Sequence, residues 1–230
     1  MSKEKTQLES HFVDPEAYDQ RIRKFVPYYE EMMKSLLDCL PELEHHPAVL
    51  ELGCGTGNLS LKLLDKNLSC ELTAIDLVQE MVRTCRARLD PYSHRAEIFC
   101  ANMIRYRKDN SFDYVFSNLA LHYPETNKKK LAVCRNVYQS LRPGGVFAFS
   151  AMLAGDSATA AEEIWKHWER DVIQNGVSRK ELDEWYRTHH RSDHPVSYAS
   201  WLKWLHESGF KHCDLAWSRT IFGTIWAIKP

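Results

Sequence analysis

Three closely spaced glycines and one acid have the spacing of a ligand-binding loop. The run Gly53-Cys54-Gly55-Thr56-Gly57 follows the apolar segment 48–52, and Asp76 ends the next apolar segment, 19 residues after Gly57. Glycine lets backbone N–H groups approach a phosphate or carboxylate closely, and a helix that starts after the loop adds positive potential. A carboxylate at the end of the neighbouring strand can accept both hydroxyls of a ribose. The spacing therefore predicts a site for an adenosine-containing molecule.

This pair of features leaves more than one cofactor class open. Nicotinamide-dinucleotide sites also place an acid about 20 residues after a glycine loop. The glycine spacing here is G-x-G-x-G rather than G-x-G-x-x-G, and Glu51 stands two residues before Gly53. Both details weigh against an NAD-dependent oxidoreductase. The remaining structural alternative is a tight turn that needs glycine for its geometry alone.

The elements that must position this loop alternate between short apolar runs and amphipathic segments. We expect strands at 48–52, 72–76, 96–100, 112–117 and 146–150, with helices after the loop and at 78–89 and 125–141. Such alternation predicts a parallel sheet with right-handed crossovers. Later segments should be helical at 158–190 and 197–207, followed by two edge strands at 213–217 and 221–228. The first 40 residues read as helical by their apolar periodicity, with Pro27 starting or kinking the main helix.

The composition and net charge of the chain weigh against several classes of function. The chain has 230 residues and a formal net charge of -1, whereas a dedicated nucleic-acid binder usually shows a basic excess. No stretch approaches the ~20 consecutive apolar residues that span a bilayer, and the polar N-terminus lacks a hydrophobic signal core. Seven cysteines without a C-x-x-C pair are typical of a reduced cytoplasmic protein. The histidine pairs lack metal-ligand spacing, so we expect no metal site.

Four motifs in order resemble the class I S-adenosylmethionine (SAM)-dependent methyltransferases. Residues 49–57 resemble the first motif of that family, and Ala74-Ile75-Asp76 resembles its ribose-binding acid motif. Residues 112–122 resemble the fourth-strand motif, and Leu141-Arg142-Pro143-Gly144-Gly145 resembles the motif before the fifth strand.

The resemblance implies an α/β fold, a Rossmann-like seven-stranded and mostly parallel sheet with an antiparallel C-terminal strand pair. We expect an N-terminal helical segment over the cofactor site at 1–44, a SAM-binding core at 45–150 and a helical cap insertion at 151–195. Residues 196–230 would complete the core. The implied cofactor is SAM, with S-adenosylhomocysteine as its product, and the implied partner is a small-molecule methyl acceptor.

The resemblance also assigns cofactor-binding positions. Gly53, Gly55 and Gly57 should lie along the methionine part of SAM, and Asp76 should hold the ribose. Many members have an aspartate after the third strand that binds the adenine amino group; here Asn102 stands there and can accept through its side-chain oxygen. The expected cofactor contacts are Tyr18, Arg23, Glu51, Gly53, Gly55, Gly57, Asp76, Leu77, Met81, Asn102, Met103, Asn118 and Leu119.

Candidates for acceptor chemistry lie outside these motifs. His122 follows the pocket segment Asn118-Leu119, so it is the first candidate for a general base; a structural histidine packed under the next helix is the alternative. Four cap aromatics could form a wall for a cationic or planar acceptor: Trp165, Trp168, Trp185 and Tyr186. Core packing at helical spacing is the favoured alternative for them. For Arg23, the alternative to a cofactor contact is an exposed position on a solvated helix face.

The C-terminal part of the sequence indicates which branch of the family the chain resembles. Its pattern, from Asn175 to Lys229, is similar to the carboxy-SAM synthases of the tRNA wobble-uridine pathway. In those enzymes an arginine of the penultimate helix binds the extra carboxylate, and Trp204 stands at that position here. We therefore expect ordinary methyl transfer, with a carboxy-SAM synthase-like or RNA-modification enzyme and a non-catalytic SAM-binding protein as alternatives. Either a monomer or a homodimer would fit.

Overall fold

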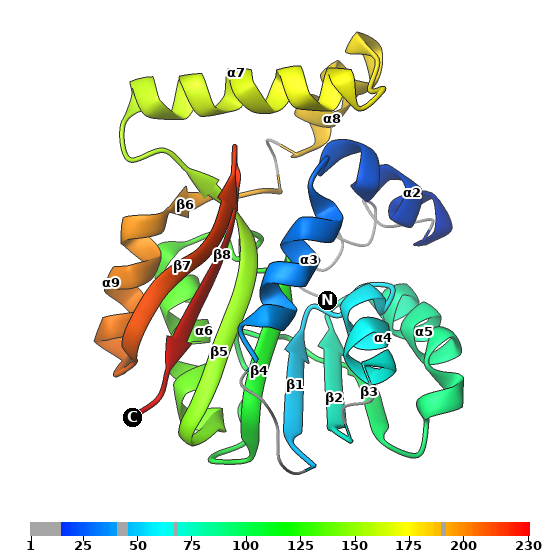
Figure 1. Cartoon of the computed structure of the whole chain (residues 1–230), viewed down its shortest axis with the longest axis vertical. Coiled ribbons are helices and arrows are strands. Elements are labelled where there is room, and N and C mark those ends of the chain that lie inside the picture. Colours follow the sequence, from blue (N-terminus) through cyan, green and yellow to red (C-terminus); the bar gives the residue numbers. More distant parts are fainter. Residues whose placement is uncertain (1–14, 41–45, 67–68, 190–191) are drawn as a thin grey trace.

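One twisted sheet forms the centre of the molecule (Figure 1). The computed structural model describes residues 15–40, 46–66, 69–189 and 192–230. Within these residues the strand order is β3-β2-β1-β4-β5-β8-β7, and the short β6 pairs with the end of β5. The strands are β1 Ala48–Leu52, β2 Glu71–Asp76, β3 Ala96–Cys100, β4 Phe112–Asn118, β5 Leu141–Ala154, β6 Val196–Ser197, β7 Lys211–Arg219 and β8 Phe222–Ile228.

The direction of the strands confirms the expected fold. Strands β1 to β5 run parallel, whereas β8 is antiparallel to both of its neighbours, β5 and β7. Most element ends lie within two residues of the sequence prediction, but β5 and β6 differ from it. Strand β5 starts at Leu141 rather than Val146, because Leu141 pairs with Phe112 ahead of the register shift. The two-residue strand β6 was not expected.

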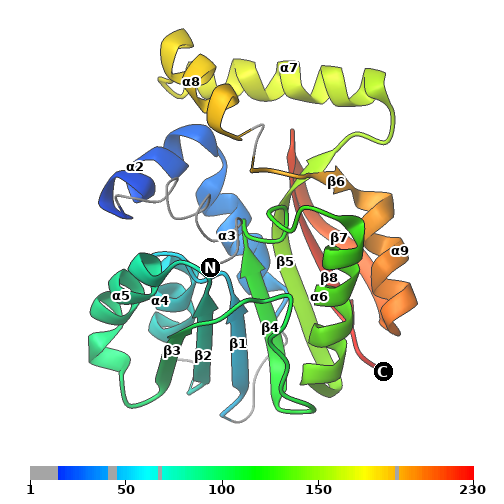
Figure 2. The same ribbon diagram turned by 180° about the vertical axis from the view of Figure 1, so that it is seen from behind.

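Helices cover both faces of the sheet (Figures 1 and 2). Helices α3 (Tyr29–Asp38), α4 (Asn58–Asp65) and α5 (Gln79–Arg88) pack on one face, and the 3-10 turn η1 (Asp90–Tyr92) follows α5. Helices α6 (Asn127–Ser140) and α9 (Tyr198–Ser208) pack on the other face, and α9 ends at Gly209 as expected. The apolar core is accordingly divided into two clusters, one on each side of the sheet.

Three further helices lie beyond the carboxyl ends of the parallel strands (Figure 1). They are α2 (Pro15–Phe25), α7 (Ala158–Gln174) and α8 (Arg179–His189). The expected helical stretch at 158–190 is broken because Gly176 adopts a left-handed φ of 88°, which ends α7 and starts the turn into α8. Pro27 lies between α2 and α3, so the N-terminal segment also forms two helices. In the described part of the chain no helix has the length and apolar character needed to cross a membrane.

Candidate functional site

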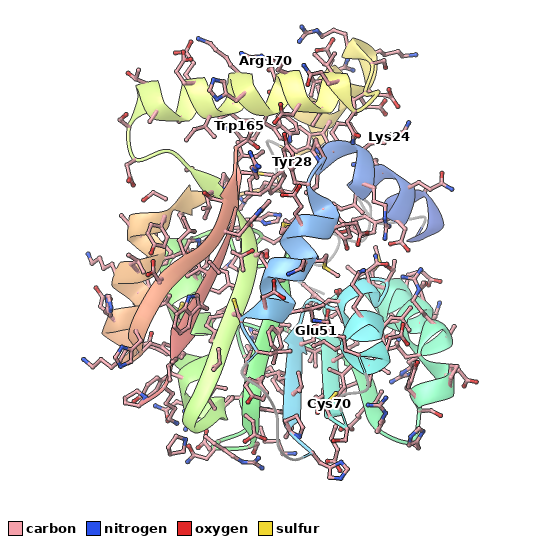
Figure 3. All side chains as sticks on the ribbon, in the orientation of Figure 1. Lys24, Tyr28, Glu51, Cys70, Trp165 and Arg170 are labelled. Atoms are coloured by element: carbon pink, nitrogen blue, oxygen red, sulfur yellow. The ribbon has the colours of Figure 1, made fainter. Side chains whose placement is uncertain are left out.

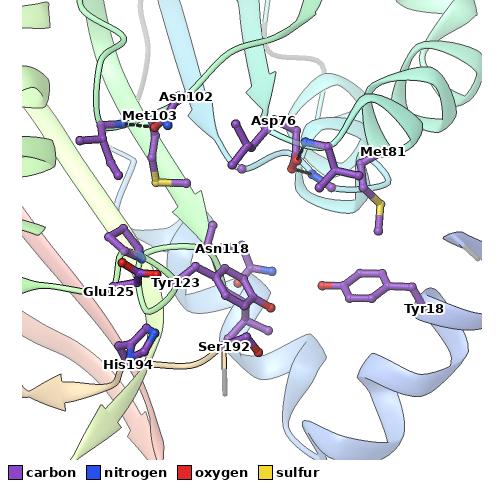
Figure 4. Close-up of a pocket in the computed structure, with 18 residues that line it drawn as sticks. Tyr18, Asp76, Met81, Asn102, Met103, Asn118, Tyr123, Glu125, Ser192 and His194 are labelled. Atoms are coloured by element: carbon purple, nitrogen blue, oxygen red, sulfur yellow. Dashed lines mark hydrogen bonds between the residues drawn. The ribbon is translucent and has the colours of Figure 1, made fainter. Parts of the chain in front are cut away.

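A cavity opens where β1, β2 and β4 end (Figure 4). It encloses about 960 Å³ of space when its open mouth and the adjoining solvent are included. Its walls come from α2, the glycine loop, the ends of β2 and β4 and the segment before β6. The lining residues are Tyr18, Gly53, Gly55, Asp76, Leu77, Val78, Met81, Asn102, Met103, Ile104, Asn118, Leu119, Ala120, Tyr123, Pro124, Glu125, Ser192 and His194.

The glycine loop folds because its three glycines adopt left-handed backbone angles. The φ values of Gly53, Gly55 and Gly57 are 73°, 52° and 87°. A Cβ at Gly53 would stand 2.3 Å from the Cβ of Ala120, so the loop and the segment after β4 touch where Gly53 lies. The backbone N–H groups of Gly53 and Cys54 both donate to the carbonyl of Ile75, which fixes the loop on β2. Gly57 is the N-cap of α4 and is not part of the cavity wall.

Asp76 holds the centre of the site. Its Oδ2 accepts from the Gly55 N–H at 2.9 Å, and its Oδ1 accepts from the Val78 N–H at 2.8 Å. Burial raises the pKa of Asp76, and the hydrogen bonds from Val78, Gly55 and Leu77 counteract that rise. This carboxyl therefore lies on the cavity wall, in contact with the loop that the sequence paired with it.

Glu51 occupies a different place from the one expected. The residue is 1 % exposed, lies below the glycine loop and does not line the cavity. Its Oε2 is hydrogen-bonded to the Ser60 hydroxyl at the start of α4. Burial raises the pKa of Glu51 to about 8, so its carboxyl is largely protonated at neutral pH. Glu51 therefore supports the loop from beneath.

An apolar slot flanks Asp76. Leu77, Met81, Met103, Val78 and Ile104 line it. Asn102 also reaches the cavity, but its Oδ1 already accepts from the N–H of Ile104 at 2.9 Å. An amide oxygen has a second lone pair, so the role of Asn102 as an acceptor for the adenine amino group stays a prediction.

Asn118 ends β4 at the cavity, and Leu119 follows it there. The Nδ2 of Asn118 donates to the Met33 thioether at 3.1 Å, and its Oδ1 is buried without a hydrogen-bond partner in the described residues. Leu119 has a left-handed φ of 54°, an uncommon backbone conformation for a residue with a branched side chain. Such strain often marks functional segments, and here it turns the chain across the cavity.

The far wall consists of residues that the sequence analysis did not select. Tyr123, Pro124 and Glu125 come from the loop after β4, and Ser192 and His194 come from the segment before β6. Their two segments meet through the His194 N–H, which donates to the His122 carbonyl at 3.0 Å. No local motif marks this wall. The adjacency of Tyr123 to His122 was the one available signal.

A buried lysine supports this wall. Lys130 is 1 % exposed, and its Nζ donates to the carbonyl oxygens of His122, at 3.3 Å, and Pro124. Burial lowers the pKa of Lys130 to about 8. The lysine therefore fixes the turn that carries Tyr123 and Pro124.

His122 is buried and is not among the residues that line the cavity. The residue is 4 % exposed, its ring centroid is 4.4 Å from that of Tyr123, and its Nε2 is 3.9 Å from Asp193 Oδ1. Its neighbour Tyr123, by contrast, lines the cavity. The role of His122 as a general base stays a prediction, and its packing against Tyr123 favours the structural alternative.

Of the two N-terminal candidates, Tyr18 reaches the cavity and Arg23 does not. The phenol of Tyr18 points from α2 into the cavity (Figure 4), and burial raises its pKa. The guanidinium of Arg23 is exposed, forms an ion pair with Glu30 at 3.4 Å and stacks over Tyr29. Arg23 as a cofactor ligand is therefore corrected: it is a solvated residue on the outer side of α2.

The four cap aromatics pack against one another. Trp168 and Trp185 are buried with centroids 4.6 Å apart, and Trp165 and Tyr186 pack on them. In Figure 3, Trp165 lies with the cap side chains, away from Glu51 at the end of β1. None of the four lines the cavity, so the expectation of an acceptor wall is corrected. They form the core that joins the cap to α2, and Trp168 Nε1 donates to the Phe25 carbonyl at 2.9 Å.

Comparison with known proteins agrees with this geometry. Residues 49–145 match the model of a family described as a methyltransferase domain. A carboxy-S-adenosyl-L-methionine synthase of Escherichia coli is 26% identical over 219 residues, which cover 93% of this chain and 88% of that protein. The synthase of Citrobacter koseri is 25% identical over the same shares of the two chains.

Solved structures share the fold. A complex between the Haloferax volcanii Trm112 methyltransferase activator and a putative methyltransferase contains a chain with a TM-score of 0.69 and 16% identity, covering 97% of each chain. Haemonchus contortus phosphoethanolamine N-methyltransferase 2, in complex with SAM, has a TM-score of 0.65 and 14% identity. That match covers 87% of this chain and 52% of the other.

Proposed function

We propose that this chain is a class I SAM-dependent methyltransferase and that it moves the methyl group of SAM to a small-molecule acceptor by in-line displacement. The observation on which this proposal depends is one continuous cavity. Asp76 and the glycine loop bound one end, and Tyr123 and His194 bound the other. SAM supplies a methyl carbon activated by its sulfonium, so the residues of this chain have to align the reactants and exclude water.

The residues present fit this cofactor. Asp76 is buried at the cavity wall and can accept from two ribose hydroxyls. The loop at Gly53 and Gly55 has no side chains, so the methionine part of SAM can lie close against its backbone. Leu77, Met81 and Met103 would flank the adenine, whereas Asn118, Leu119 and Tyr18 would surround the methionine end.

A protonated acceptor also needs a base. We assign this role to His194, because it lines the cavity wall, whereas His122 does not line the cavity and packs against Tyr123. At saturating SAM, His194→Gln should lower turnover at least tenfold. His122→Gln, the matched control, should lower it less. Equal loss in both variants would return the role to His122 or to the wall as a whole.

Co-purified ligand provides the most direct test of the function. Native mass spectrometry of the purified protein should find SAM or S-adenosylhomocysteine, and calorimetry should detect binding of both. Transfer of a labelled methyl group from SAM into fractionated metabolite extracts would then identify the acceptor. A nicotinamide dinucleotide in the cavity, or no binding of either SAM compound, would contradict the proposal.

A second candidate function is synthesis of a carboxylated SAM derivative. The similarity to proteins named carboxy-SAM synthases extends over 93% of the chain and favours it. Trp204 opposes it, because this side chain is 7 % exposed and packs edge-on against Trp201, and an indole cannot form an ion pair with a carboxylate. A co-purified ligand with the mass of carboxy-SAM would favour this candidate. SAM alone would favour methyl transfer.

We also propose a cytoplasmic location. All seven cysteines are free thiols, which suits a reducing compartment. The proposed partner is a small molecule rather than a nucleic acid, as the net charge of -1 suggests. Either a monomer or a homodimer is consistent with this proposal.

A further inference from the structure

A closed polar cluster joins α2, the glycine loop and α5. Asp19 Oδ1 accepts from the Thr56 hydroxyl at 2.6 Å and from Asn58 Nδ2 at 2.8 Å. Asp19 Oδ2 forms an ion pair with Arg88 Nη2 at 2.6 Å. The other nitrogen of the fork, Arg88 Nη1, donates to Asn58 Oδ1 at 2.9 Å and to Thr56 Oγ1 at 3.3 Å. Both oxygens of the carboxylate thus have partners on other elements.

The cluster holds the end of α2 that lies over the cofactor side. The opposite end of α2 is fastened to the cap: Trp168 donates to the Phe25 carbonyl, Asn175 donates to the carbonyls of Arg23 and Lys24, and Lys24 pairs with Glu181. Tyr18, one residue before Asp19, points into the cavity (Figure 4). The helix is therefore anchored at its C-terminal end and attached to the binding loop near its N-terminal end.

We propose that Asp19 and Arg88 form a clasp that closes α2 over the cavity, and that opening of this clasp controls the exchange of SAM and S-adenosylhomocysteine. Lifting the N-terminal end of α2 would withdraw Tyr18 from the cavity and separate Asp19 from Thr56, which stands between Gly55 and Gly57. The inference rests on the SAM site of the proposed function and not on the identity of the acceptor.

The clasp is partly shielded from water. The side chains of Asp19 and Arg88 are 16 % and 29 % exposed, whereas both partners of the Lys24–Glu181 pair are at least 42 % exposed. Burial opposes the ionised form of Asp19, but the hydrogen bonds from Thr56, Arg88 and Asn58 outweigh burial and lower its pKa. The carboxylate is therefore charged at neutral pH and the clasp is intact. Partial exposure leaves the pair accessible to screening by salt.

Loss of a clasp changes both the association and the dissociation rate constant of the ligand, whereas loss of a ligand contact mainly changes the dissociation rate constant. Because it is closed in the protein without ligand, its loss should ease both entry and exit. In Asp19→Asn and in Arg88→Gln, the association and dissociation rate constants of S-adenosylhomocysteine should each rise about tenfold, the effect of losing one charge-assisted hydrogen bond. The dissociation constant should change less than threefold. Stopped-flow tryptophan fluorescence and calorimetry measure these quantities.

A control exists on α5. Arg83→Gln removes an exposed ion pair with Glu80 and should leave both rate constants within twofold of the wild type. The double variant Asp19→Asn/Arg88→Gln should resemble either single variant, because both remove the same interaction. Raising the ionic strength from about 0.05 to 0.5 M should accelerate exchange of this zwitterionic ligand in the wild type and not in the double variant.

Three results would overturn the clasp. One is unchanged rate constants in both single variants that melt like the wild type. Another is a weaker affinity that arises from faster dissociation alone, which would make Asp19 a support of the binding loop. The third result comes from hydrogen exchange of the wild type, which decides if the variants do not fold. Without ligand, the amides of α2 should exchange faster than those of α3, and S-adenosylhomocysteine should slow the exchange of α2.

Equal protection of α2 and α3 without ligand would refute the clasp. Absence of any binding would instead refute the proposed function.

Discussion

The two ends of the cavity are built in different ways. At the end that we propose for the cofactor (the cofactor end), Gly53, Gly55 and Asp76 lie at the ends of adjacent parallel strands, and backbone hydrogen bonds fix their positions. At the end that we propose for the acceptor (the acceptor end), Tyr123 and His194 come from segments separated by the whole of α6, β5, α7 and α8. The cofactor end is thus specified locally, whereas the acceptor end depends on where the cap returns to the sheet. Change in the cap can alter the acceptor while leaving the cofactor site intact.

The largest expected effect is a loss of cofactor affinity on substitution of Asp76, which should distinguish the cofactor end of the cavity from the acceptor end. Asp76→Ala should weaken S-adenosylhomocysteine binding about a thousandfold, because the loss of two charge-assisted hydrogen bonds costs roughly 3 to 6 kcal/mol. His194→Gln at the other end should change this affinity less than threefold. Calorimetry on both variants, with melting curves to confirm folding, measures the contrast. Similar losses in the two variants would mean that the cavity does not divide in this way.

Gly53 is the point where the two ends touch. Gly53→Ala should lower the free energy of unfolding by about 3 kcal/mol, because it adds left-handed strain and places a methyl group 2.3 Å from the Cβ of Ala120. Gly55→Ala is the matched control: its φ is also left-handed, but no atom lies within 4 Å of the added Cβ, so about 1 kcal/mol is expected. Urea denaturation gives both values. Equal costs would show that the contact with Ala120 is not tight.

Glu51 tests how the cofactor end is supported. Burial raises its pKa to about 8, so between pH 4.5 and 8 the folded state binds more protons than the unfolded state and stability falls as the pH rises. Glu51→Gln cannot titrate. Between pH 5 and pH 7 the free energy of unfolding of the wild type should fall by about 2 kcal/mol relative to that of this variant. Linkage sets an upper limit of about 1.36 kcal/mol per pH unit for one titrating group. Urea denaturation at pH 5, 6 and 7 checks this, and parallel curves for the two proteins would contradict a buried, protonated Glu51.

These contrasts also explain which features the sequence could predict. The sheet, the loop and Asp76 follow from short-range patterns, since apolar period, glycine spacing and a strand-end acid lie within about 30 residues. His122, Arg23 and the cap aromatics were selected by residue type, but their roles depend on the directions in which their side chains point. Arg23 turns outward to Glu30, and Trp168 turns into the cap core. His194 and Ser192 could not be found, because tertiary packing alone brings their segment to the loop after β4.

The smallest expected effect tests whether the cap is independent of the cavity. Trp168→Phe keeps most of the buried ring but removes the N–H that donates to the Phe25 carbonyl, so the free energy of unfolding should fall by about 1 kcal/mol. The dissociation constant of S-adenosylhomocysteine should stay within twofold, because the cluster at Asp19 still attaches α2 to the glycine loop. Trp165→Phe, half-buried in the same aromatic group, is the control for ring size and should cost less. A loss of affinity in Trp168→Phe alone would mean that the cap positions α2 relative to the cofactor site. The cap and the cavity would then not be independent of each other.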